Sequence, residues 1–148
     1  MKMRLIRTVC FLGLAAPLMI CDAAVANAHA DTAVIVNLNN KASLQPEQIK
    51  NIFLGRLNRF PDGSPAKPVD QPEERPIRIT FYSKVAGKDE DEMKTYWADL
   101  IFSGNGRPPK AVDEDSEVKQ YVRETVGGIG YIDSKSLDGS VRVIYTLK

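Results

Sequence analysis

The sequence predicts a single α/β domain with a small mixed sheet flanked by about four helices. Two short β-branched runs, residues 33–38 and residues 141–147, have the composition of strands near either end of the domain. Amphipathic patterns of helical period lie between them, so strands and helices interleave along the chain. Internal repeats and low-complexity tracts are absent from the sequence. One modest core is therefore expected over residues 31–148.

Residues 1–30 have the order of segments found in a secretory signal peptide. A basic start precedes the apolar run 9–20, and small residues then offer cleavage after Ala28 or Ala30. The apolar run is too short to span a bilayer comfortably. Lipidation at Cys21 is the weaker alternative, because Ile20 stands where lipoprotein processing favours a small residue. We therefore expect an exported, periplasmic protein with no transmembrane segment after cleavage.

The remaining composition excludes several classes of function. Both cysteines and the single histidine lie within residues 1–30, so residues 31–148 contain no thiol and no imidazole. No disulfide, metal site, cofactor or catalytic centre is expected there. Removing residues 1–30 changes the formal net charge from +1 to −1. This near-neutral balance argues against binding to nucleic acid or to a membrane surface.

The first half of the domain contains one helix and one long loop. The segment 44–57, "LQPEQIKNIFLGRL", has apolar residues at helical spacing, with Pro46 in the first turn and Gly55 placed to end the helix. Five prolines within residues 58–76 exclude a helix and leave room for only a short strand at 67–70. This stretch is a loop inside the domain, since neither flank can form a core alone.

The segment after the loop fits two patterns. In "PIRITFYSKVAG", apolar residues repeat every four positions as in a helix, but Ile77, Ile79 and Phe81 also alternate as in a strand. We favour the helix because Pro76 supplies a start and Gly87 a stop.

Two further helices are expected. Residues 89–92 form an acidic quartet that suits the first turn of a helix, and they lack the spaced oxygen ligands of an EF-hand calcium loop. The spacing of the residues that follow predicts that Trp97, together with Tyr96 and Phe102, belongs to the core. After the turn "SGNGRPPK", Ser116 is expected to cap a helix that ends at Val126. A single core is predicted to combine Ile49, Ile52, Phe53, Trp97, Leu100, Val118, Val122 and Ile129.

The stretch "VGGIGYID" places three glycines between this helix and a strand. Gly127 is expected to adopt the left-handed conformation of a helix C-cap, while Gly128 and Gly130 allow the chain to approach its neighbours closely. A phosphate-binding glycine loop has the opposite order, with a strand before it and a helix after it. The same order argues that Gly104 and Gly106 end a helix and do not form an anion loop. We therefore predict a structural corner at 127–130.

With these elements in place, the sequence resembles a known family. Residues 33–147 resemble one lobe of the phosphate-binding proteins of ABC transporters, in the type-2 periplasmic-binding-protein superfamily. The stretches that carry the resemblance are, in order, "LQPEQIKNIFLGRL", "RFPDGSP", "YWADLIFSGNG" and "VKQYVRETVGGIGYID". The resemblance implies a mixed sheet flanked by helices and a non-enzymatic role in phosphate binding.

Two departures from the family limit what the resemblance implies. Transport-competent members have two lobes that clamp phosphate, and this chain has no counterpart of the first lobe. In the Ser-Gly-Thr-Arg-like turn that opens a helix of the second lobe, only Arg78 matches, because Arg75, Pro76 and Ile77 occupy the other positions. We expect Arg78, with help from Arg75, to hold any bound phosphate or other small anion where the helix starting near Pro76 meets the end of the first strand. The alternative is that both arginines are solvated and paired with Glu73 and Glu74.

Two functions follow from this resemblance. The first is an exported, non-enzymatic protein like the substrate-binding proteins of phosphate ABC transporters, with weak binding of phosphate or another anion. The second is a periplasmic interaction module that has lost ligand binding and whose partner is an ABC transporter or another envelope protein. A half-clamshell leaves exposed the face that meets the other lobe, and exposed apolar surface favours protein contacts.

Overall fold

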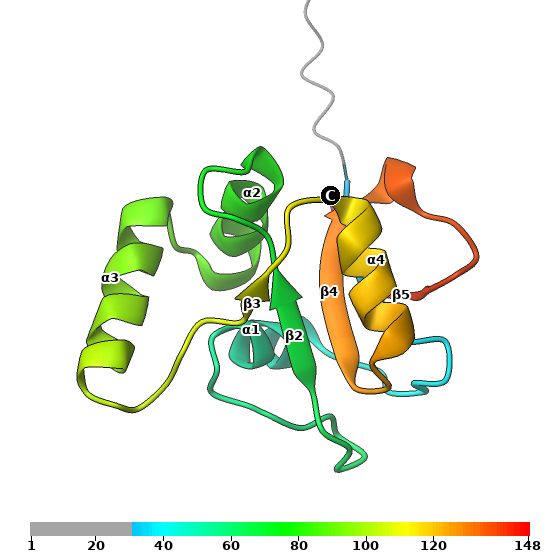
Figure 1. The fold of residues 1–148 in the computed structure, drawn as a ribbon, viewed down its shortest axis with the longest axis horizontal. Helices are drawn as coiled ribbons and strands as arrows, with labels where there is room; N and C mark the ends of the chain where they lie inside the picture. Colours follow the sequence, from blue (N-terminus) through cyan, green and yellow to red (C-terminus); the bar gives the residue numbers. More distant parts are fainter. Residues whose placement is uncertain (1–30) are drawn as a thin grey trace, which may run out of the picture.

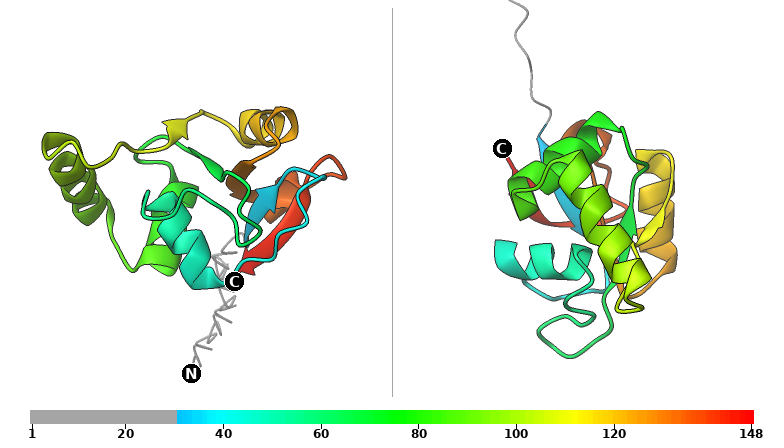
Figure 2. Two further views of the ribbon diagram at one scale, coloured as in Figure 1. Left: turned by 90° about the horizontal axis from the view of Figure 1, so that it is seen from below. Right: turned by 90° about the vertical axis from the view of Figure 1, so that its left-hand side faces the viewer.

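The computed structural model describes residues 31–148, which form one five-stranded mixed sheet with helices on both faces (Figures 1 and 2). The strand order is β3-β2-β4-β1-β5. Strand β2 is parallel to β3 and β4, whereas β1 runs antiparallel to β4 and β5. The strands are β1 (Thr32–Val36), β2 (Lys67–Asp70), β3 (Lys110–Ala111), β4 (Gly128–Asp133) and β5 (Arg142–Leu147). The predicted α/β class and mixed sheet are confirmed.

Helices α1, α2 and α3 lie on one side of the sheet, and α4 covers the other (Figure 2). The bounds are α1 (Pro46–Phe53), α2 (Pro76–Ala86), α3 (Glu90–Phe102), α4 (Asp115–Glu124) and the 3-10 turn η1 (Ser134–Ser136). In Figure 1, α3 stands at one end of the molecule, furthest from β5. Among residues 31–148 no helix has both the length and the apolar character needed to cross a membrane. The predicted signal peptide, its cleavage site and the alternative of lipidation at Cys21 lie outside the described residues.

The segment with two possible patterns is a helix. Pro76 occupies the first turn of α2, and Gly87 ends it with φ 63°, so both predicted boundary signals act as expected. Gly55 also adopts a left-handed conformation, with φ 69°. It follows the C-cap Leu54, so α1 ends earlier than the predicted segment 44–57.

The predicted boundaries of α4 are wrong by one or two residues at each end. Glu114, not Ser116, is the N-cap, and the Glu117 side chain reaches back to it in a capping box. Two backbone N–H groups before the helix, those of Asp113 and Glu114, donate to the Glu117 carboxylate at 2.8 and 3.3 Å. Because Thr125 is extended, the helix ends at Glu124 and not at Val126.

The predicted single core is wrong, because the sheet divides it in two. Side chains alternate across each strand, so Val34 and Ile129 face α1–α3 whereas Ile35 and Ile132 face α4. Of the eight residues expected together, Val118 and Val122 pack on the α4 side and the others on the α1–α3 side.

The aromatic residues of α3 do not all join the core. Trp97 is buried, and Tyr96 packs partly against the same cluster. Phe102, expected in the core, is 96% exposed. It follows Met93 by nine residues and Trp97 by five, so at about 100° per residue it points away from both of these buried side chains. Helical spacing therefore places Phe102 on the face of α3 opposite the core.

The corner at 127–130 is confirmed as a structural feature, although one detail of the prediction is wrong. Gly127 does not have a positive φ. A Cβ added to it would lie 2.2 Å from the Pro65 carbonyl oxygen, and one added to Gly130 would lie 2.5 Å from Val118 Cγ1. Close approach, and not left-handed conformation, therefore requires glycine at both positions.

Candidate functional site

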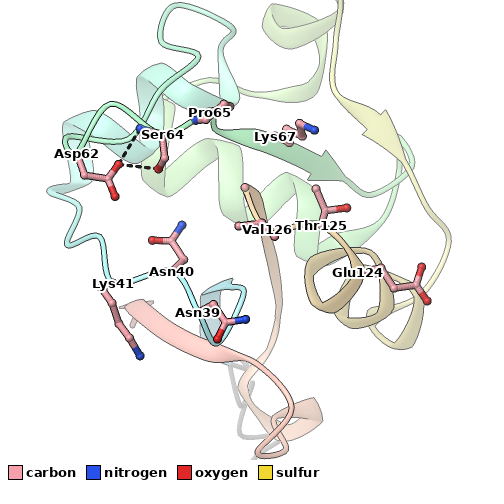
Figure 3. Close-up of a pocket in the computed structure, with 11 residues that line it drawn as sticks. Asn39, Asn40, Lys41, Asp62, Ser64, Pro65, Lys67, Glu124, Thr125 and Val126 are labelled. Atoms are coloured by element: carbon pink, nitrogen blue, oxygen red, sulfur yellow. Dashed lines mark hydrogen bonds between the residues drawn. The ribbon is translucent and has the colours of Figure 1, made fainter.

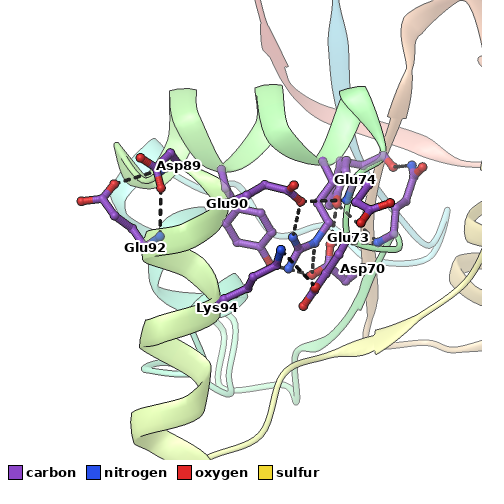
Figure 4. A network of polar contacts seen from close by, with 11 residues as sticks. Asp70, Glu73, Glu74, Asp89, Glu90, Glu92 and Lys94 are labelled. Atoms are coloured by element: carbon purple, nitrogen blue, oxygen red, sulfur yellow. Dashed lines mark hydrogen bonds and ion pairs between the residues drawn. The ribbon is translucent and has the colours of Figure 1, made fainter.

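The end of β2 and the start of α2 meet at a buried polar cluster on the α1–α3 side of the sheet. We call it the Arg78 cluster and define it as Asp70, Arg78, Tyr82, Glu90 and Tyr131. Three local features assemble it. The side chain of Asp70, the last residue of β2, points to the side opposite that of its neighbour Val69; α2 begins six residues later; and the first turn of α3 brings Glu90 alongside (Figure 4).

Arg78 lies at the centre of this cluster and is only 4% exposed. Its Nε is 3.4 Å from Asp70 Oδ2, and its Nη1 is 3.4 Å from Glu90 Oε1. The guanidinium carbon also lies 5.0 Å from the centre of the Tyr82 ring, a cation–π distance. Burial lowers the pKa of Arg78, but attraction to Asp70 and other neighbouring groups outweighs burial and raises it overall. The guanidinium is thus ionised and faces two carboxylates.

Asp70 is fully enclosed and accepts hydrogen bonds from several directions. The Tyr82 hydroxyl donates to Oδ2 at 2.8 Å, while the Tyr131 hydroxyl and the Gln71 N–H donate to Oδ1. Burial, followed by the negative charge of Asp70, raises the pKa of both tyrosines well above the ordinary value, so both hydroxyls keep their protons. Four donors, counting Arg78, therefore surround one buried carboxylate.

Glu90 joins α3 to the start of α2. Its Oε1 accepts a hydrogen bond from the backbone N–H of Glu74 at 2.7 Å, in addition to the contact with Arg78. Glu74 has φ 71° and is the one non-glycine residue with positive φ among those the structure describes. Its N–H and the Arg78 guanidinium thus converge on one oxygen of the Glu90 side chain.

A second set of polar contacts links this region to α4 through the sheet. The Gln71 Nε2 donates to Asp115 Oδ1 and to the Tyr131 carbonyl, both at 3.0 Å. The other oxygen of Asp115 accepts from the Asp133 N–H and the Ser136 hydroxyl. Within the described chain, Gln71 Oε1 is buried without a hydrogen-bond partner. Asp115 therefore ties the start of α4 to β2 and to the end of β4.

The two arginines predicted to bind an anion have different surroundings. Arg78 belongs to the cluster, whereas Arg75 is the half-buried N-cap of α2 and its side chain makes no hydrogen bond or ion pair with residues 31–148. The expected position at the end of the first strand is wrong, since Arg78 contacts the end of β2, the second strand. The alternative pairing is also wrong for Arg78, because its partners are Asp70 and Glu90 and not Glu73 or Glu74. A role for either arginine in ligand binding stays a prediction.

Sequence reasoning missed the acidic and phenolic members of the cluster. The sequence pattern places Asp70 only in the short strand and Glu90 only in the first turn of a helix. One available signal was a charged residue at the end of a short strand, directly before a helix that carries an arginine. Tyr131 lies in the "GIGYID" strand, where its alternation with Gly130 places it on the α2 side.

A polar hollow lies at the opposite end of β2 (Figure 3). Its volume is about 550 Å³, and residues lining it include Asn40, Lys41, Asp62, Lys67 and Glu124. The two lysines balance the two acids, so the hollow has no net preference for an anion. Asp62 accepts hydrogen bonds from the N–H and hydroxyl of the neighbouring Ser64, which lower its pKa. In the part of the chain that is described, no three acidic, histidine or cysteine side chains are grouped as metal ligands.

No protein-family model and no curated protein matches the sequence. Solved structures do match. A Vibrio cholerae ABC-type phosphate transport receptor is 21% identical with a TM-score of 0.61, over 78% of this chain and 46% of that one. A putative phosphate ABC transporter substrate-binding protein with bound phosphate from Clostridium perfringens is 24% identical with a TM-score of 0.60, over 78% of this chain and 45% of that one. PstS from Borrelia burgdorferi is 14% identical with a TM-score of 0.57, over 78% and 47%.

These similarities establish the fold. The described domain has the fold of part of a phosphate-transport binding protein, as the resemblance in sequence predicted. The chain spans about half the length of the solved structures it matches, which is consistent with one lobe.

Proposed function

We propose that this chain is a non-enzymatic, exported single-lobe protein that acts through protein contacts in the cell envelope and does not depend on bound phosphate. The observation that carries the proposal is that the Arg78 guanidinium already pairs with two carboxylates, those of Asp70 and Glu90. The Asp70 side chain is 3% exposed, and the Glu90 side chain is 21% exposed. A phosphate approaching Arg78 would meet more negative than positive charge.

The local backbone also supports this proposal. A buried oxyanion needs several convergent donors, and loss of each one weakens binding substantially. Pro76 provides no N–H in the first turn of α2, and Ile77 provides no hydroxyl. The Glu74 N–H, which points into this region, donates to Glu90. Donors from a second lobe are not among residues 31–148.

Weak anion binding is the second candidate function, with Arg78 and Arg75 as its proposed site residues. Its support is the similarity to the Clostridium perfringens protein, whose structure holds bound phosphate. Arg75 has no ion-pair partner among residues 31–148 and lies at the positive end of α2. With so few donors, we expect a dissociation constant in the high-micromolar to millimolar range, or about −4 to −5 kcal/mol.

Thermal unfolding of the mature protein separates the two functions. A ligand that binds only the folded state stabilises it by about 2.7 kcal/mol at 100 times its dissociation constant. We expect phosphate to raise the melting temperature no more than chloride of equal ionic strength does. A phosphate-specific rise in wild type that is lost in Arg75→Ala would contradict the proposal and establish the second candidate. Arg75→Ala suits this comparison because it leaves the Arg78 cluster intact.

The partner side of the proposal has its own test. Crosslinking in intact cells, followed by purification of the mature protein, is expected to yield the same transporter or envelope protein at low and at high phosphate. A complex whose yield follows the phosphate concentration would instead favour a ligand-dependent function.

A further inference from the structure

We propose that Glu90 is a tethered ligand: its carboxylate occupies an oxyanion site formed by the Glu74 N–H and the Arg78 guanidinium, and a small oxyanion from solution binds there when the Glu90 side chain is removed. The inference rests on the proposed function, because it explains why the start of α2 does not take up a free anion. The two donors of the oxyanion site are still in place and become accessible when the Glu90 side chain is removed.

The geometry of Glu90 is that of a bound carboxylate. One oxygen, Oε1, lies 2.7 Å from the Glu74 nitrogen and 3.4 Å from Arg78 Nη1. A backbone N–H and a guanidinium converging on one oxygen are the donors that bind small oxyanions elsewhere in proteins. In Figure 4, Glu90 extends from the start of α3 towards Glu74 and the Asp70 region.

Glu90 is not needed to cap α3. Asp89 and Glu92 form that cap: Asp89 Oδ1 accepts the Glu92 N–H, and Glu92 Oε2 accepts the Asp89 N–H, both at 2.9 Å (Figure 4). The other acid in this turn, Asp91, has no hydrogen bond from its side chain to another described residue. Removing the Glu90 side chain therefore leaves the start of α3 capped, and its main effect falls on Arg78 and Glu74.

Glu90 is also the replaceable one of the two acids that contact Arg78. The Asp70 side chain is enclosed at 3% exposure and held by two tyrosine hydroxyls, whereas the Glu90 side chain is 21% exposed. Solvent therefore has access to the position of the Glu90 carboxylate. Without it, Arg78 keeps one carboxylate partner, and the Glu74 N–H has no acceptor there.

Chemical rescue of Glu90→Ala tests the inference. We expect this variant to melt below wild type, and sodium formate or acetate to restore at least half of the lost melting temperature, while sodium chloride of equal ionic strength does not. Phosphate is the second probe and tests whether a larger oxyanion fits. The matched control is Glu73→Ala, which removes an exposed acid 3.9 Å from Lys94 and should melt like wild type with or without formate.

A second variant keeps the test decisive. Glu90→Gln retains an oxygen that can accept the Glu74 N–H and fills the same space, so we expect formate to leave its melting temperature unchanged. Rescue of Glu90→Gln as strongly as Glu90→Ala, or absence of rescue in Glu90→Ala, would overturn the inference. The proposed function fails on a different result, a phosphate-specific rise in wild type, so the two failures are distinguishable.

Discussion

The two faces of the sheet are covered by different means. On the α1–α3 face, large aromatic side chains surround a buried charge, with Phe81 and Tyr131 stacked at a centroid distance of 3.9 Å and an interplanar angle of 6°. On the α4 face, small aliphatic side chains such as Val69, Val118 and Val122 pack without any buried ion pair between described residues. On the α1–α3 face, the packing depends on buried polar groups that need hydrogen-bond or ion-pair partners. On the α4 face, it depends on how closely the helix approaches the strands.

The two faces also differ in how closely their sequences match the pattern of phosphate-binding proteins. The resemblance to phosphate-binding proteins is strong at the glycine corner beside α4, where added atoms would clash. It is weak at the start of α2, where Arg75, Pro76 and Ile77 depart from the pattern and Asp70 and Glu90 satisfy the remaining arginine. The sequence pattern of the resemblance is thus kept where the fold requires close approach and altered at the start of α2.

The largest expected effect comes from removing Asp70. Asp70→Ala leaves Arg78 buried with only Glu90 as a partner and leaves the Tyr82 and Tyr131 hydroxyls without their acceptor. Breaking a buried pair in this way costs about 3–5 kcal/mol of unfolding free energy. Urea denaturation of the mature protein and of the Asp70→Ala variant measures this loss of unfolding free energy.

The control for this prediction is Asp70→Asn, which keeps the shape and one acceptor oxygen while removing the charge. It should lose less stability than Asp70→Ala. A loss below about 1 kcal/mol for Asp70→Ala, the range typical of an exposed pair, would show that the cluster does not stabilise the α1–α3 face.

A smaller loss is expected from crowding the α4 face. Gly130→Ala places a methyl group 2.5 Å from Val118 Cγ1 and 2.9 Å from Val69 Cγ1, in a buried position. Overpacking of this kind costs about 1–3 kcal/mol of unfolding free energy. Gly139→Ala is the matched control, since nothing lies within 4 Å of its added Cβ.

A double variant sharpens the prediction. In a chain that carries Val118→Ala, the methyl group of Gly130→Ala has more room. The double variant should therefore lose less unfolding free energy than the sum of the losses of the two single variants. If the two losses of unfolding free energy were strictly additive, Val118 of α4 would not limit the space at Gly130 of β4.

The difference between the faces also explains what the sequence can predict. Pro76 and Gly87 define α2 locally, and the order of glycines after α4 predicts a corner, because these signals act over a few residues. Which of the four acids at 89–92 reaches Arg78 depends on the angle at which α3 meets α2, and no local pattern encodes that angle. The division of the core depends likewise on which helix crosses which face, whereas periodicity reports only that a face exists.

The smallest expected effect lies at an exposed ion pair on the α4 face, a counterpart of the buried pair on the other. Lys119 Nζ is 2.6 Å from Asp138 Oδ2, and the Asp138 side chain is 52% exposed. The hydrogen bond from Lys119, followed by those from Ser140, lowers the pKa of Asp138 well below its ordinary range. A folded-state pKa below the unfolded value of about 3.9 stabilises the fold above that pH, and the stabilisation is lost as the pH falls towards the folded value. Wild type should therefore be slightly more stable than Asp138→Asn at neutral pH, and urea denaturation across the acid range should show the difference shrinking below about pH 4. Added salt should also reduce it, because exposed charges are screened. A difference as large as that of Asp70→Ala, or one that persists in acid, would remove the contrast between the buried and exposed pairs.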